Sequence, residues 1–230
     1  MKRNVTSLSL VAAAALASLG VAAPASAELS ATGGLVSEYY FRGVGLGDAG
    51  AYGSLDYSVA GFTLGSWIID DGSASNDGLE TDFYAGYGMS HGDNFSWNVA
   101  YNRYEYTYTS DYEDEVAVSL GLPVGISLQL VRGEIHDEEG VSPDLDTGYR
   151  YVSLGWAGEV FGVLVGDSAN IARGDESSYS HAEVSASGEV STIAVGVTAG
   201  VVFNANDAAG DDIASGDGYI VFDISKTFTF

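Results

Sequence analysis

The sequence predicts an all-β fold, an antiparallel transmembrane β-barrel of about 12 strands. Three observations predict it: apolar residues alternate with small or polar ones along most of the chain, two classes of connection take turns between these segments, and the last residue is a phenylalanine. Because successive side chains of a strand point to opposite faces, this alternation gives one apolar and one polar face. Such faces suit a wall between lipid and a polar lumen.

The alternation is clearest in residues 193–203, where Ile193, Val195 and Val197 are separated by small residues. A helix here would spread its apolar side chains around the whole circumference, and the abundance of Val, Ile, Thr, Tyr and Gly also disfavours a helix. The expected strands lie near residues 29–42, 51–60, 62–70, 80–90, 95–108, 115–122, 126–136, 149–157, 161–171, 180–188, 191–204 and 217–230.

The connections fall into a short class and a longer, acidic, Gly/Ser-rich class, and the two alternate strictly. This pattern is typical of outer-membrane barrels, which have short periplasmic turns and longer outer loops, so both termini are expected to be periplasmic. No loop is long enough to be expected deep inside the lumen. A soluble β-sandwich or lipocalin-like barrel would explain the alternation, but not the two loop classes.

Residues 1–27 have the features of a secretory signal peptide. Lys2 and Arg3 precede an uncharged apolar run at residues 11–21, and Ala25-Ser-Ala27 fits a cleavage site. The apolar run is too short for a transmembrane helix. The expected organisation is therefore a cleaved signal peptide at 1–27 and one barrel at 28–230, exported to the outer membrane of a Gram-negative bacterium.

The composition excludes several classes of protein. The chain has 32 acidic and 8 basic residues, and cleavage at 27 would leave six basic residues and a formal charge of −26. So acidic a chain is not expected to bind nucleic acid through its phosphates. The absence of cysteine excludes disulfides and Cys-ligated metals. We expect no cofactor. We also expect no metal site, because the acidic loops lack EF-hand spacing. Weak binding of divalent cations by these loops stays open.

One family resemblance rests on residues 34–43, Gly-Leu-Val-Ser-Glu-Tyr-Tyr-Phe-Arg-Gly. This stretch resembles the opening of the TorF family of proteobacterial outer-membrane porins, in which the pattern runs G-x-V-S-x-Y-x-F-R-G. Weaker similarity continues at residues 53–57, 61–67 and 80–87, so the resemblance covers roughly the first third of the mature chain. It implies an outer-membrane barrel with a porin function.

The C-terminus resembles the signature by which outer-membrane proteins engage the barrel-assembly machinery. Phe228 and Phe230 carry this assembly signal, and Phe222 and Ile224 continue the same apolar alternation. Lys226 departs from the pattern, because it falls on the apolar face. Near the periplasmic interface its ammonium group could reach the lipid headgroups.

If the apolar face meets lipid, the opposite face lines a lumen. The pore-lining residues expected from this alternation are Glu38, Tyr40, Arg42, Asp56, Glu80, Asp82, Tyr84, Arg150, Glu183 and Asp223. Rings of acidic side chains favour cation passage. The alternative is that these charges pair across a narrow barrel and close it.

The sequence thus predicts a porin-like channel for small solutes that prefers cations. Its expected partners are outer-membrane lipid and lipopolysaccharide, the assembly machinery, and small solutes or cations. The alternative function is a non-conducting structural or adhesive barrel that acts through its acidic surface loops.

No enzyme activity is expected. His91 falls in a short turn, and His136 and His181 are expected to be polar residues at strand ends near the outer rim, without a nucleophile motif beside them. A group of tyrosines is expected to form the outer aromatic girdle rather than a sugar-binding track; they are Tyr101, Tyr104, Tyr106, Tyr108 and Tyr112.

Overall fold

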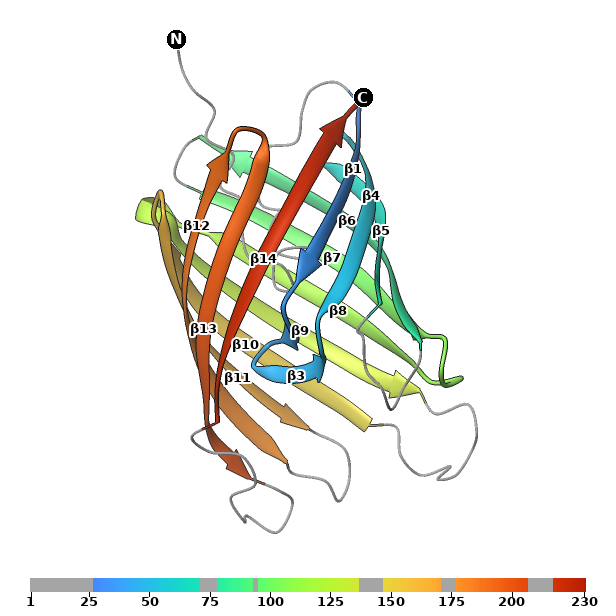
Figure 1. The fold of residues 1–230 in the computed structure, drawn as a ribbon, viewed down its shortest axis with the longest axis vertical. Coiled ribbons are helices and arrows are strands. Elements are labelled where there is room, and N and C mark those ends of the chain that lie inside the picture. Colours follow the sequence, from blue (N-terminus) through green and yellow to red (C-terminus); the bar gives the residue numbers. More distant parts are fainter. Residues whose placement is uncertain (1–26, 71–77, 93–94, 137–146, 171–176, 207–216) are drawn as a thin grey trace.

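The computed structural model describes residues 27–70, 78–92, 95–136, 147–170, 177–206 and 217–230. Within these residues, 12 strands close into one antiparallel barrel, as predicted (Figure 1). The barrel strands are β1 (Glu28–Val36), β4 (Gly50–Val59), β5 (Phe62–Asp70), β6 (Leu79–His91), β7 (Phe95–Tyr106), β8 (Tyr112–Gly121), β9 (Ile126–His136), β10 (Thr147–Ala157), β11 (Phe161–Asn170), β12 (Ser178–Val190), β13 (Ile193–Asn206) and β14 (Gly218–Thr229).

The first and last strands close the barrel. β1 pairs with β14 through Ser30 and Thr229 and with β4 through Leu35 and Ala51, so each wall strand is paired on both sides. Closure leaves no open edge, which a lipid environment requires. Both ends of the wall lie at the rim that carries the short turns, and the strand ends that flank the longer connections lie at the opposite rim (Figure 1).

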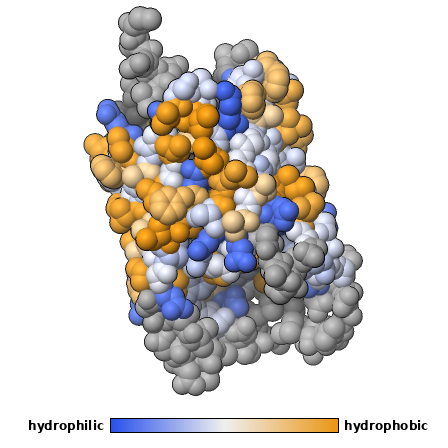
Figure 2. All heavy atoms as spheres, in the orientation of Figure 1, coloured by the Kyte–Doolittle hydropathy of each residue, from blue (hydrophilic) through white to orange (hydrophobic). Residues whose placement is uncertain are grey.

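The outer face of the wall is apolar and the inner face is largely polar. Leu35, Leu64 and Phe222 expose 57%, 62% and 60% of their surface, whereas Asn102 and Ser153 on the inner face are buried. Figure 2 shows apolar side chains over much of the visible face between the two rims. An apolar surface of this extent is unfavourable in water and is satisfied by lipid.

The expected signal peptide lies outside the described residues, except for Ala27 at its end, and stays a prediction. β1 begins directly after it, at Glu28. In the part of the chain that the structure describes, no helix is both long and apolar enough to cross a membrane.

One predicted strand is wrong at its end. The strand expected at 29–42 leaves the wall after Val36, and the chain forms a small hairpin of β2 (Tyr39–Phe41) and β3 (Val44–Gly47) before β4 begins. At the exit point the Ser37 amide donates to the Phe222 carbonyl at 2.9 Å, and the Ser37 hydroxyl accepts from the Phe222 amide at 2.9 Å. Ser37 therefore ends the pairing with β14 and lets the chain turn into the barrel.

Some inward tyrosines lie directly across a glycine of the neighbouring strand. Tyr149 on β10 is opposite Gly133 on β9, and a methyl group on Gly133 would come within 2.2 Å of the Tyr149 ring. We expect Gly133→Ala to lower the free energy of unfolding by about 1–3 kcal/mol, because the ring has to move.

The measurement is the temperature at which the folded gel band of the unboiled protein disappears. Gly33→Ala is the matched control, because a methyl group there meets no atom within 4 Å. Equal stability of the two variants would contradict this account of the Gly133 position.

Candidate functional site: a lumen narrowed by a hairpin

The β2–β3 hairpin turns at Arg42 and Gly43, which both have positive φ angles, 52° and 86°. This is the two-residue turn that matches the twist of antiparallel strands. Gly43 adopts such a φ freely, but for Arg42 it costs about 1 kcal/mol or more. A non-glycine residue keeps this conformation only where its surroundings hold it, so the contacts of Arg42 are informative.

The hairpin crosses the lumen rather than standing outside the rim. Its tip residue Arg42 is only 8% exposed and bonds Glu115 on β8, which is five strands from β1 around a wall of 12. Its other tip residue, Gly43, packs against His181 on β12. In Figure 1, β3 runs across the direction of the wall strands where β1 ends. The expectation that no loop enters the lumen is therefore wrong.

A buried ion pair fixes the tip of the hairpin. Both terminal nitrogens of Arg42 donate to the two oxygens of Glu115, and the Nη2–Oε2 distance is 3.0 Å. The hydroxyls of Tyr104 and Tyr149 donate to the same carboxylate at 2.8 and 2.6 Å. Every strong hydrogen-bonding position of Glu115 is thus used, and a buried charge is stable only with this degree of satisfaction.

Aromatic contacts hold the rest of the hairpin. Tyr39 packs on Trp67 with ring centroids 5.8 Å apart, and its hydroxyl donates to Glu80 at 2.9 Å. Tyr39 lies on the hairpin and not on a wall strand. Its burial raises the pKa of its phenol well above the usual value, and the negative charge of Glu80 is the second largest cause. Tyr39 therefore stays a neutral donor, and the contacts of Phe41 with Tyr104 complete the anchoring.

Carboxylates crowd the wall that faces the hairpin. Glu80 and Asp82 on β6 and Glu113 and Glu115 on β8 share the inner face, and Arg42 pairs with Glu115. The Oδ1 atom of Asp82 is buried without a hydrogen-bond partner among the described residues. Both polar atoms of the Asn102 amide, which is 1% exposed, are in the same situation. This part of the lumen therefore combines excess negative charge with unused oxygen ligands.

Six of the residues expected to line the pore lie on the inner face of the wall strands. Besides Glu80 and Asp82, these are Asp56 and Tyr84, which hydrogen-bond each other, and Glu183 and Asp223. Glu183 accepts from Tyr219 at 2.7 Å and lies 3.2 Å from the His181 ring. Whether these side chains line a conducting path stays a prediction.

Three of the remaining expected residues are on the inserted segment instead of a wall strand. Glu38 is exposed between β1 and β2, Tyr40 stacks on Tyr219, and Arg42 forms the ion pair described above. Tyr40 and Arg42 enter the lumen because the hairpin carries them there, and not through the alternation of β1.

The prediction for Arg150 is wrong. Its neighbours Tyr149 and Tyr151 point inward to Glu115 and His181, so Arg150 points outward. There its exposed side chain lies 3.7 Å from Asp167 on β11.

Other side chains of the lumen were not expected there. His181 is 1% exposed, with its Nε2 atom 3.0 Å from the Tyr151 hydroxyl, so the expectation of an exposed residue at a strand end is wrong. Tyr104 and Tyr106 bond Glu115 and Glu113 and so leave the predicted aromatic girdle, whereas Tyr101 and Tyr108 are exposed. Each of these inward residues lies an even number of positions from a polar inward residue of the same strand, and therefore on the same face. This spacing is the sequence signal that could have placed them in the lumen.

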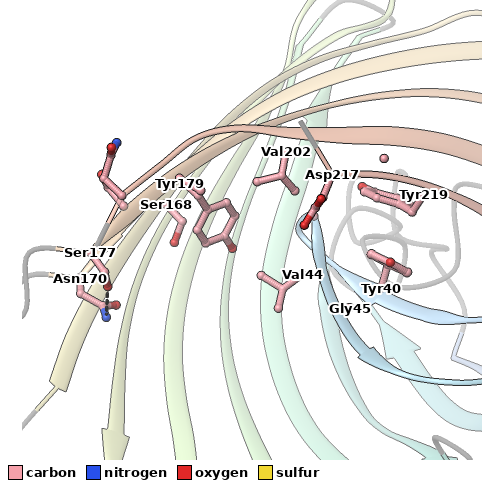
Figure 3. Close-up of a pocket in the computed structure, with 15 residues that line it drawn as sticks. Tyr40, Val44, Gly45, Ser168, Asn170, Ser177, Tyr179, Val202, Asp217 and Tyr219 are labelled. Carbon is pink, nitrogen blue, oxygen red and sulfur yellow. Dashed lines mark hydrogen bonds between the residues drawn. The ribbon is translucent and has the colours of Figure 1, made fainter. Parts of the chain in front are cut away.

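A cavity of about 360 Å³ opens between the hairpin and strands β11 to β14 at the rim of the longer connections. Tyr40 and Tyr219 line one part of it and Tyr179 another, with Asp217 between them in the view of Figure 3. Within the described parts of the chain, no group of three or more His, Cys, Asp or Glu side chains is placed to hold a metal ion. The acidic segments at 137–146 and 207–216 lie outside those parts.

Two solved structures, with TM-scores above 0.5, agree with the fold. The KdgM porin has a TM-score of 0.52 and 9% identity over 88% of this chain and 99% of that one. A structure from work on the in-meso crystallization of membrane proteins gives 0.56 and 9% over 88% and 84%. The outer membrane protein OprD from Pseudomonas aeruginosa gives 0.47 and 9% over 88% and 65%.

No curated protein sequence matches the chain. The resemblance to the TorF family stays a prediction. A family model for Gcw_chp, described as a bacterial protein of unknown function, matches residues 21–136. That match covers half of the sequence, and the chain therefore belongs to the bacterial Gcw_chp family.

Proposed function

We propose that this protein is an outer-membrane channel of a Gram-negative bacterium that passes small solutes and prefers cations. The observation that carries the proposal is the closed wall of 12 strands, apolar outside and rich in carboxylates inside. A barrel of this size lies between eight-stranded barrels filled with side chains and 16-stranded porins with a wide channel. The inserted hairpin narrows the path further, which favours small solutes.

The cation preference follows from the inner charges. At least seven carboxylates belong to the described inner face, against the single guanidinium of Arg42; they are Asp56, Glu80, Asp82, Glu113, Glu115, Glu183 and Asp223. Low-dielectric walls focus the field of such charges and concentrate cations in the lumen. Phosphate groups and other anions are repelled by the same field.

The proposed location includes a signal peptide at 1–27, periplasmic termini, and recognition of Phe228 and Phe230 by the assembly machinery. Phe228 is exposed on the outer face beside Lys226, whose Nζ atom bonds Thr192 at 2.6 Å in the short turn. A basic side chain at this rim suits the headgroup level of a membrane. The partners proposed are outer-membrane lipid, lipopolysaccharide and small solutes, and the chain is proposed not to be an enzyme.

A second candidate is a non-conducting barrel that acts through its acidic loops. The buried pair of Arg42 and Glu115 favours it, because this contact crosses the lumen. The two candidates differ in one measurable property, which is conduction.

The test is planar-bilayer recording with the full-length mature barrel refolded in detergent. We expect discrete conductance steps in KCl and a reversal potential that reports cation preference under a salt gradient. A folded barrel, shown by different gel mobility before and after boiling, that gives no steps would contradict the channel and favour the second candidate.

A further inference from the structure

We propose that the cavity between the hairpin and strands β11 to β14 binds a small organic ammonium ion, such as a quaternary amine. This goes beyond the proposed channel function, because binding does not require conduction. The cavity measures about 360 Å³, which is the size of a small-molecule site and far more than a bare alkali cation fills.

Tyrosine rings give the cavity its first cation-binding feature. Tyr40 and Tyr219 stack with centroids 4.0 Å apart, and Tyr179 lines another part of the same cavity. Aromatic faces and the negative potential above them attract ammonium groups, and methylated ammonium ions in particular. The stacked pair also fixes the hairpin against β14, so this part of the cavity is preformed.

Asp217 supplies the only charge among the described residues that line the cavity. Its side chain is exposed and lies between Tyr179 and the Tyr40–Tyr219 pair in Figure 3. Arg42, the basic residue next to the lining residue Gly43, is bound to Glu115 on the far wall and is not available to attract an anion. The charge balance therefore favours a positive ligand.

Three of the side chains that line the cavity already donate hydrogen bonds within the protein, which disfavours a sugar ligand. The Asn170 amide donates to Ser177 at 2.9 Å, and the Asn206 amide donates to the Asn204 carbonyl at 3.0 Å. The Tyr219 hydroxyl donates to Glu183 at 2.7 Å. A sugar needs free donors and acceptors for its own hydroxyls. An alkylated ammonium ion instead needs ring faces, a carboxylate and apolar contacts, and Val44 and Val202 provide the apolar contacts.

The test is calorimetric titration of the refolded, full-length mature barrel in detergent at low salt. Three probes are compared: choline, its neutral carbon isostere dimethylbutanol, and glucose. We expect saturable binding of choline at least about tenfold tighter than of the isostere, since both fill the same volume but only one carries charge. Preference for glucose, equal binding of choline and its isostere, or no choline binding would each overturn the proposal.

Variants locate the site. Asp217→Asn and Tyr179→Leu are each expected to weaken choline binding roughly three- to tenfold, while Tyr179→Phe retains it because the ring face remains. Glu134→Gln is the matched charge control, because Glu134 is exposed on the outer face of β9 and away from the cavity. Equal loss in Glu134→Gln and Asp217→Asn would overturn the site and leave only a bulk charge effect.

The experiments can contradict the ammonium site and the channel function independently of each other. Conductance in KCl without choline binding removes the ammonium site and leaves the channel. Choline binding that depends on Asp217 in a barrel without conductance keeps the site and removes the channel.

Discussion

Replacing Arg42 with methionine is expected to raise the single-channel conductance about twofold or more, because the unpaired buried charge left on Glu115 displaces the narrowing hairpin. The variant leaves the Glu115 carboxylate buried, unpaired and close to Glu80, Asp82 and Glu113 on the same inner face. Breaking one side of a buried ion pair costs about 3–5 kcal/mol. The hairpin also loses the ion pair that holds the backbone of residue 42 at a positive φ.

A double variant separates the charge from the loss of bulk. Arg42→Met with Glu115→Gln removes both charges, keeps similar volumes and leaves the contacts of Tyr39 and Phe41 in place. We therefore expect its conductance to return toward that of the original protein. Adding the Glu115→Gln single variant completes the double-mutant cycle from which the coupling of the pair is measured.

Planar-bilayer recording of single channels is the measurement for both variants. Gel mobility before and after boiling shows that each barrel has folded. Identical conductance of the original protein and of the folded Arg42→Met variant would contradict the role of the hairpin as a constriction.

The wall of the barrel could be predicted from the sequence because its signal is local. Residues two apart share a face, so segments such as 193–203 show their apolar side without any knowledge of their partners. The alternation of short and longer connections then gives the number of strands and places both termini at one rim.

The alternation predicts the inner residues only where the parity of a strand is assigned correctly. Arg150 was assigned to the inner face, but it has the same parity as Leu154 and Trp156, which are exposed on the outer face. His181 has the same parity as Glu183, and that parity places it inside.

The hairpin could not be predicted in the same way. Residues 34–42 continue the alternation of β1, and a strand that leaves the wall has the same extended backbone and the same pattern as one that stays in it. What pulls the segment inward is the pairing of Arg42 with Glu115, 73 residues further along the chain. Such a long-range contact has no local signal.

The second large effect concerns the selectivity of the lumen. Glu80→Gln with Asp82→Asn is expected to move the reversal potential under a KCl gradient toward zero, because two carboxylates that face the hairpin lose their charge. The original protein is expected to prefer cations. Charges on the outer connections act over about 10 Å at 0.1 M salt but only about 3 Å at 1 M, whereas a narrow charged lumen is screened less.

The measurement is therefore made at low and at high mean salt. The shift between the original protein and the double variant is expected to persist at high salt, because Glu80 and Asp82 are 6% and 8% exposed. The matched control is Glu134→Gln with Asp167→Asn, which removes two charges from the exposed outer face and is expected to leave the reversal potential unchanged. Anion preference of the original protein, or an equal shift in the two double variants, would show that carboxylates at the hairpin do not set the selectivity.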